Sequence, residues 1–152
     1  AEVAGFGNAC DAFHQTASSE DGEGAYLAMC KALKRANVQP CQVDYINCHG
    51  TGTPNNDPSE LTAMRRLFGE TLPPFSSTKG YTGHTTSASG SIEAVFCLLA
   101  LQEQFMPMNL HLQQPIEPWA VPVTENKNAK LKYVLCNAFG FGGNDSSILL
   151  SI

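Results

Sequence analysis

The stretch VDYINCHGTGTPNNDPSE, residues 43–60, decides how the rest of the chain is organised. It opens with a short apolar run that predicts a strand ending in a turn: Val43, Tyr45, Ile46 and Cys48. It closes with signals for a helix start. Asp57 is expected to cap that helix, Pro58 to occupy its first position, and Glu60 to complete a capping box. The stretch therefore predicts a strand, a loop and a helix in succession.

The loop inside this stretch, HGTGT, carries the residues with chemical potential. In α/β sheets, ligands bind just beyond the carboxyl ends of strands. We therefore expect His49 to lie at such a strand end, with the hydroxyls of Thr51 and Thr53 beside it. The sequence predicts a binding or catalytic loop here.

Length and composition indicate one folded domain with a substantial core. The chain has 152 residues, of which 43% are hydrophobic and 15% are charged. Nine basic and fourteen acidic residues give a formal charge of −5, without a basic cluster. This charge disfavours nucleic acid as a partner.

Targeting and redox signals are weak throughout the chain. Its longest apolar run, residues 94–101, is far shorter than the ~20 residues that span a bilayer, and the N-terminus lacks the pattern of a signal peptide. We therefore expect no membrane association and a cytoplasmic location. The first residue is not Met, so we expect a processed or excised piece. None of the six cysteines forms a CxxC pair, which favours reduced thiols in apolar or helical contexts and disfavours a metal site.

The remaining pattern predicts alternating strands and helices, with a helix at 24–36 that has an apolar stripe. Residues 2–14 predict a strand that enters a glycine-containing bend and then a loop. The other expected elements are a helix at 58–68 capped by Gly69, a short strand within 71–77, a helix through 92–105 stopped by Pro107, an irregular proline-rich segment at 107–132, and strands at 133–137 and 145–151.

A second informative stretch, STKGYTGHT, places Lys79 and His84 five residues apart. Small residues follow, and then a helix whose middle is apolar all round, so we expect it to be buried centrally. His84 falls close to the start of that helix, where a neutral imidazole can donate from one nitrogen and accept at the other. Glu93 is the lone carboxylate on the apolar part of the helix. It is expected either to anchor toward Lys79 or backbone, or to be partly exposed.

The C-terminal strands are joined by the glycine-rich turn FGFGG, residues 139–143. It is not a dinucleotide-binding fingerprint, because no helix opens after it. Gly140, Gly142 and Gly143 flank Phe141, which would let the backbone approach a ligand and the ring swing.

These motifs, in this order, resemble the C-terminal half of β-ketoacyl-acyl-carrier-protein synthases of the condensing-enzyme (thiolase-like) superfamily. They are His49 in HGTGT, Lys79 with His84 in STKGYTGHT, and Phe141 in NAFGFGG, and the resemblance covers essentially all of residues 1–152. It implies an α/β fold with a mixed β-sheet and packed helices in βαβαβαββ order. It also implies that residues 1–152 are one C-terminal domain and that the nucleophile lies in an N-terminal half that this chain lacks.

The resemblance implies a decarboxylative Claisen condensation of malonyl thioesters with an enzyme-bound acyl group, in fatty acid, polyketide or polyene biosynthesis. His49 and His84 would donate hydrogen bonds to the malonyl thioester oxygen, and Lys79 would order the histidines. Glu93 matches a buried structural glutamate of the family.

The resemblance also implies how substrates arrive. Thr51 and Thr53 would bond the pantetheine arm, and Phe141 would act as a gate whose backbone N–H helps to hold the acyl oxyanion. No cofactor of the chain's own is expected, because phosphopantetheine arrives on the acyl carrier protein, the expected partner. The full-length protein is expected to be a homodimer.

Departures from the family pattern leave alternatives open. No motif here matches the nucleophile, and Cys48 and Cys136 are better explained as buried strand thiols. Relatives often have Thr-Asn where this chain has Asn144-Asp145. One alternative is a chain-length-factor-like, non-catalytic partner in a heterodimer. The Lys79–His84 motif disfavours a thiolase or an initiating synthase. The convergence of histidines, threonines and turn glycines at strand ends disfavours histidines with a purely structural role. The isolated chain is expected to be inactive, and to expose apolar surface or self-associate.

Overall fold

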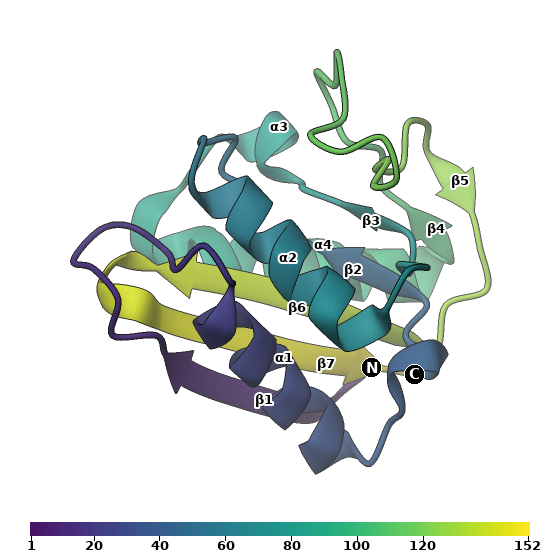
Figure 1. Cartoon of the computed structure of the whole chain (residues 1–152). Helices are drawn as coiled ribbons and strands as arrows, with labels where there is room; N and C mark the ends of the chain where they lie inside the picture. The colour runs from purple at the N-terminus through teal and green to yellow at the C-terminus, as the bar shows by residue number, and fades with distance from the viewer.

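A five-stranded mixed sheet lies between two helical layers in the computed structural model, which describes residues 1–152 (Figure 1). The elements are β1 (Glu2–Cys10), α1 (Glu23–Ala36), β2 (Tyr45–Asn47), α2 (Asn56–Phe68), β3 (Phe75–Ser76), α3 (Lys79–Thr82), α4 (Ser89–Glu103), β4 (Phe105–Met106), β5 (Lys127–Asn128), β6 (Tyr133–Gly140) and β7 (Asn144–Ser151). Short 3-10 turns occupy Pro40–Gln42, Thr86–Ala88 and Phe141–Gly143. Apart from the short α3, β4 and β5, this is the predicted βαβαβαββ order.

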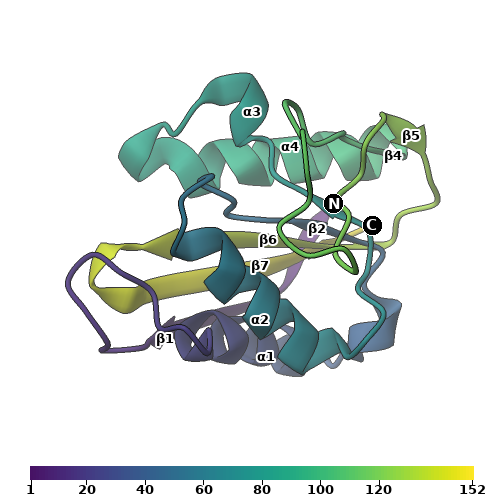
Figure 2. The same cartoon turned by 45° about the horizontal axis from the view of Figure 1, so that its top comes forward.

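The sheet order β1-β7-β6-β2-β3 brings the first and last long strands together. β2 pairs in parallel with β3 and β6, whereas β7 pairs antiparallel with β1 and β6. Helices α1 and α2 cover one face and α4 covers the other, as Figure 2 shows. Two buried cores result: Met29, Ile46, Met64 and Leu135 belong to the first, and Tyr45, Cys97, Leu101 and Val134 to the second.

Helix α1 packs unusually close to β1, because the facing residues are small. A Cβ on Gly7 would lie 2.1 Å from the carbonyl oxygen of Ala28, and one on Gly5 would lie 2.2 Å from that of Ala32. The expectation of a bend at these glycines is wrong. β1 runs through both of them, with a register shift between Val3 and Gly5. They are required for helix packing rather than for a turn.

Two further expectations are wrong. Helix α4 is not buried all round: Val95 is 54% and Leu99 43% exposed, because only one side of α4 covers the sheet. The expected exposed apolar surface lies in part on this helix, at Val95 and Leu99. The segment 107–132 is not wholly irregular, since β5 pairs antiparallel with β4. Helix α4 ends at Glu103, ahead of Pro107, with Gln104 in the left-handed conformation (φ 53°).

The edge of β1 is covered by basic side chains from α1. Lys31 Nζ donates to the carbonyl of Asn8 and Arg35 Nη1 to that of Phe6, each at 2.8 Å. The Arg35 guanidinium also lies 4.2 Å from the centre of the Phe6 ring. These contacts occupy carbonyls that an incoming strand would otherwise pair with.

All six cysteines are free thiols. Cys48, Cys97 and Cys136 are buried, whereas Cys41 is exposed in the 3-10 turn Pro40–Gln42 and Cys10 is exposed at the end of β1, so the expectation of apolar or helical surroundings fails for Cys10. No helix in the structure has the length and apolar character needed to cross a membrane.

Candidate active site

The loop after β2 is held by a buried glutamate of α2. Glu60 Oε1 accepts the His49 backbone N–H and Oε2 that of Gly50, both at 3.0 Å, while Asn137 Nδ2 donates to Oε1 at 3.0 Å. The capping-box prediction is therefore wrong: Glu60 faces the sheet and binds the loop, not the helix start. Helix α2 begins at Asn56, and the Asp57 carboxylate accepts the Gly52 N–H at 3.1 Å.

Lys79 lies at the centre of a buried polar cluster. Its Nζ is 3.1 Å from His49 Nδ1 and also donates to the carbonyl oxygen of His49 and to Glu93 Oε1. Ser89 Oγ donates to the same Glu93 oxygen at 3.1 Å. Burial raises the pKa of Glu93, against the opposing pull of the Lys79 ammonium. Of the two expectations for Glu93, anchoring toward Lys79 is confirmed and partial exposure is wrong.

This contact assigns the donor and acceptor of the His49 ring. An ammonium has only donors, so Nδ1 of His49 accepts and Nε2 carries the proton in the neutral ring. Burial, followed by the Lys79 and His84 charges, lowers the pKa of His49 to about 3. His49 is therefore a neutral hydrogen-bond donor at neutral pH.

His84 stands beside His49 but is exposed. Their ring centres are 5.5 Å apart and the rings are nearly perpendicular, at 89°. The Thr86 backbone N–H donates to His84 Nδ1 at 3.1 Å, so Nε2 carries the proton of the neutral ring here as well. His84 precedes the 3-10 turn Thr86–Ala88, and α4 begins only at Ser89. Each of the two neighbouring neutral rings thus has its N–H donor at Nε2.

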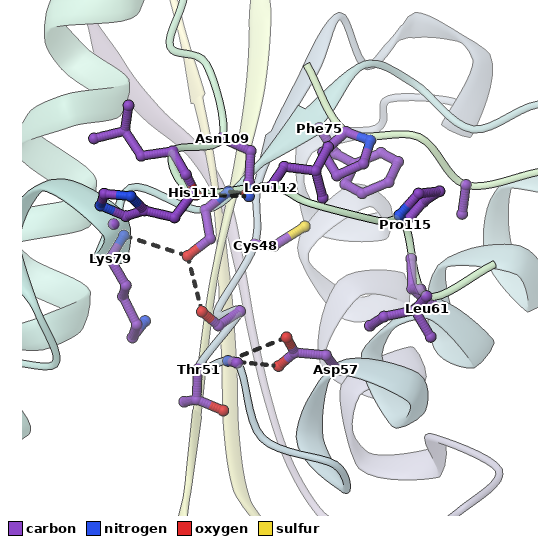
Figure 3. A pocket seen from close by; sticks show the side chains of 18 of the residues that line it. Cys48, Thr51, Asp57, Leu61, Phe75, Lys79, Asn109, His111, Leu112 and Pro115 are labelled. Atoms are coloured by element: carbon purple, nitrogen blue, oxygen red, sulfur yellow. Dashed lines mark hydrogen bonds between the residues drawn. The ribbon is translucent and has the colours of Figure 1, made fainter. Parts of the chain in front are cut away.

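Thr51 and Thr53 lie side by side, with hydroxyl oxygens 3.0 Å apart. Thr51 borders a cleft of about 830 Å³ between the His49 loop, α2 and residues 109–122. Figure 3 shows Thr51 next to Asp57, with Leu61 and Phe75 among the other side chains that line this cleft. Thr53 is exposed and is not part of the lining.

The glycine-rich turn lies at the end of β6. Phe141 is 79% exposed, and Gly142 and Gly143 have φ of 78° and 70°, which favour glycine. Gly140 is extended (φ −120°), so its conformation does not require glycine.

Sequence reasoning missed Phe139. This buried residue of β6 lies near His49, with ring centres 5.9 Å apart, whereas the ring of Phe141 is exposed. Alternation along β6, which turns Phe139 inward and Gly140 outward, is the signal that could have identified it.

The thiols near this site have surroundings typical of structural cysteines. Burial, and then the Glu60 carboxylate, raises the pKa of Cys48 well above its usual value. Its Sγ contacts Met64 Sδ at 3.7 Å. Cys136 is buried in the core beneath α4. No group of three or more His, Cys, Asp or Glu side chains in the structure is arranged to hold a metal ion.

The fold and this histidine–lysine cluster together define a thiolase-like α/β domain, and solved structures agree. The ishigamide ketosynthase/chain length factor superposes with a TM-score of 0.93 at 31% identity, over 99% of this chain and 38% of that one. A ketosynthase from Xenorhabdus doucetiae, in complex with its chain length factor, gives 0.89 at 37% identity, over 99% and 38%. A type II polyketide ketosynthase in complex with its acyl-carrier protein gives 0.91 at 30% identity, over 98% and 38%.

A family model described as the C-terminal domain of β-ketoacyl synthase matches residues 1–113, and the chain belongs to this family. It is 41% identical to the mitochondrial 3-oxoacyl-[acyl-carrier-protein] synthase of Arabidopsis thaliana, over 99% of this chain and 34% of that protein. It is also 41% identical to 3-oxoacyl-[acyl-carrier-protein] synthase 2 of Vibrio harveyi, over 98% and 37%. The chain thus spans about a third of the length of these curated relatives.

Proposed function

We propose that this chain is the C-terminal domain of an elongating 3-oxoacyl-[acyl-carrier-protein] synthase in fatty acid biosynthesis. One observation carries the proposal: Lys79 binds His49 Nδ1, so that the proton of the neutral ring is on Nε2, and His84 lies beside it with the same tautomer. The names of the curated relatives support the same activity.

In the proposed reaction, malonyl thioester loses CO₂ and the electrons of the broken C–C bond move into an enolate. The N–H groups of His49 and His84 donate to the thioester oxygen, where negative charge develops. The enolate carbon then attacks an acyl thioester, forming a C–C bond while the C–S bond breaks and the thiolate leaves. The low pKa of His49, about 3, keeps it a neutral donor throughout the usual pH range.

The other residues have supporting roles in this proposal. Lys79 fixes the tautomer of His49 and is itself held by Glu93. The hydroxyls of Thr51 and Thr53 bond the pantetheine arm. The backbone N–H of Phe141 stabilises the oxyanion of the acyl thioester, and its exposed ring gates access to the site.

The proposed partner is an acyl carrier protein that delivers acyl and malonyl groups on phosphopantetheine, so the domain needs no cofactor of its own. One solved relative is a ketosynthase in complex with its acyl-carrier protein, which supports this choice. We further propose a homodimeric full-length enzyme with its nucleophilic cysteine outside residues 1–152, so that this chain alone is inactive.

The test uses the intact protein that contains this chain, and measures CO₂ release from malonyl-acyl-carrier protein. His49→Ala and His84→Ala should each slow decarboxylation by about 10²–10³-fold, the usual cost of one oxyanion donor. The control is His14→Ala, because His14 is likewise an exposed histidine whose Nδ1 accepts a backbone N–H two residues on, at 3.1 Å. Unchanged decarboxylation in either test variant would remove that histidine from the mechanism.

A second candidate is a non-catalytic partner of the chain-length-factor kind. It is favoured by the solved relatives in which a ketosynthase occurs together with such a factor. The residue at the nucleophile turn of the intact protein discriminates the two: a cysteine supports the synthase. Any other residue there, together with activity only when a second ketosynthase is added, supports the partner subunit.

A further inference from the structure

Asp145, the second residue of β7, is a buried carboxyl group that the proposed mechanism does not use. Its residue is 4% exposed, and its side chain has no hydrogen bond within the chain. A Cβ on Gly24 would lie 1.9 Å from Asp145 Oδ2, so the first turn of α1 packs directly against this carboxyl group. The carboxyl oxygens keep some contact with solvent, but burial of the residue still disfavours the charged form.

The charged groups that face Asp145 have the same sign as its ionised form. Asp11 approaches from the loop after β1 and Glu60 from α2. The nearest acidic residue of α1, Glu23, is paired instead with Arg66 at 2.6 Å. The N-terminus of α1 favours a negative charge. On balance, however, burial and the two carboxylates raise the pKa of Asp145 to about 7.

Asp11 connects this cluster to the glycine-rich turn Phe141–Gly143. Its carboxylate accepts the Ser19 N–H at 3.0 Å, which ties the loop of residues 11–19 together. A Cβ on Gly143 would lie 2.2 Å from Asp11 Oδ1, so the backbone of the turn packs directly against this carboxylate. Gly142 donates its N–H to the Gln15 carbonyl at 2.8 Å. Asp11 and Asp145 also border one narrow gap that is too small to hold a water molecule.

We propose that Asp145 is a positioning residue whose protonation state decides whether the glycine-rich turn stays packed against the loop of residues 11–19. When Asp145 is protonated, it adds no negative charge beside the Asp11 and Glu60 carboxyl groups, and the turn stays in place. When Asp145 releases its proton to solvent, its new negative charge is repelled by the Asp11 carboxyl group and the contact loosens. The consequence for Phe141 as a gate rests on the proposed function; the loosening itself does not.

Two measurements on the intact protein test this proposal. A ¹³C carboxyl titration by NMR, assigned by comparison with Asp145→Asn, should show Asp145 titrating near pH 7. Hydrogen–deuterium exchange, corrected for the intrinsic effect of pH, should show protection of residues 10–19 and 139–146 falling by up to about tenfold per pH unit above that midpoint. The Asp145→Asn variant should keep its protection at both pH 6 and pH 8.5.

Glu125→Gln is the matched control, because Glu125 is exposed and the substitution removes one carboxylate elsewhere. It should retain the pH dependence of the unmodified protein. A midpoint near 4 for Asp145, or an equal pH dependence in Asp145→Asn, would overturn the proposal. The NMR titration of the unmodified protein decides the matter even if Asp145→Asn folds poorly. Neither readout depends on catalysis, so a failed decarboxylation assay would count against the proposed function alone.

Discussion

At the scale of single residues, Lys79 has the most consequential set of contacts. Its ammonium group has three N–H donors and is surrounded by three acceptors, which are His49 Nδ1, the His49 carbonyl oxygen and Glu93 Oε1. Lys79 and Glu93 are both buried, at 8% and 2% exposure, so neither charge is solvated by bulk water. Removing one partner would leave the other charge buried and uncompensated, which typically costs ~3–5 kcal/mol.

Lys79→Met is therefore expected to lower the free energy of unfolding by roughly 3–5 kcal/mol, measured by urea denaturation. The double variant Lys79→Met/Glu93→Gln should recover a substantial part of that loss, because it removes the stranded charge. If the single and double variants were equally unstable, the loss would come from packing rather than from the unpaired carboxylate.

Asp145 and His49 make opposite contributions to the pH dependence of stability. The pKa of His49 is lowered from 6.5 to about 3, so the unfolded chain binds more protons and stability is lost as pH falls through this window. The pKa of Asp145 is raised from 3.8 to about 7, so the folded chain binds more protons and stability is lost as pH rises from about 4 to about 7.

The Asp145 contribution can be isolated with the Asp145→Asn variant, which does not titrate. Its free energy of unfolding relative to the unmodified protein should grow between pH 4 and pH 7 and then level off. At about 1.4 kcal/mol per pKa unit, the full change is on the order of 4 kcal/mol. Denaturation curves at several pH values measure it, and a constant difference across the series would contradict the raised pKa.

At the scale of elements, the contact between β1 and α1 depends on residues without side chains. Gly7 faces the α1 backbone so closely that an added Cβ would lie 2.1 Å from the Ala28 carbonyl oxygen and 2.7 Å from the Ala32 nitrogen. Both atoms belong to the helix backbone, so the clash can be relieved only by moving the whole helix.

Gly7→Ala should therefore destabilise the protein at or above the upper end of the ~1–3 kcal/mol range for overpacked cores. Gly140→Ala is the matched control, because Gly140 is extended and its nearest contact would be an ordinary 3.5 Å. Thermal unfolding measures both variants. Similar melting temperatures for the two would show that α1 shifts at little cost.

The elements that the sequence predicted well are those with local signals. Helix α1 was expected at 24–36 and spans Glu23–Ala36, and Gly69 caps α2 as expected, with φ 79°. Glu60 was misassigned because its true partners are Gly50, ten residues away, and Asn137, seventy-seven residues away. A capping box is a local pattern, and it could not reveal that burial against the sheet would take precedence.

The candidate site likewise contains residues that a short motif identified and residues whose positions depend on distant contacts. The resemblance supplied His49, His84 and Lys79 as a set, and the structure brings these three together. It did not supply Phe139 or Asp145, whose positions follow from the pairing of β6 with β7, where the two residues are opposite each other. Register between distant strands is not encoded in any short motif.

At the scale of the whole molecule, β1 is an edge strand that α1 protects. Lys31 and Arg35 occupy the outward carbonyls of Asn8 and Phe6. Charged side chains on an edge strand are a common defence against pairing with another chain.

Replacing both with glutamine should therefore increase self-association, measured by sedimentation velocity at several concentrations. The control is Lys34→Gln/Lys130→Gln, which removes two exposed positive charges that do not contact β1. Equal association of both double variants would attribute the effect to net charge rather than to the uncovered strand edge.

Helix α4 has a mechanical role that follows from its two sides. One side holds the Glu93 carboxylate, which fixes Lys79 and through it the ring of His49, while Val95 and Leu99 face outward on the other. Because Glu93 is part of α4, a displacement of this helix would move the carboxylate that holds the Lys79 ammonium group. The position of α4 therefore helps to set the orientation of the imidazole, although Val95 and Leu99 lie on the side of the helix that faces away from the ring.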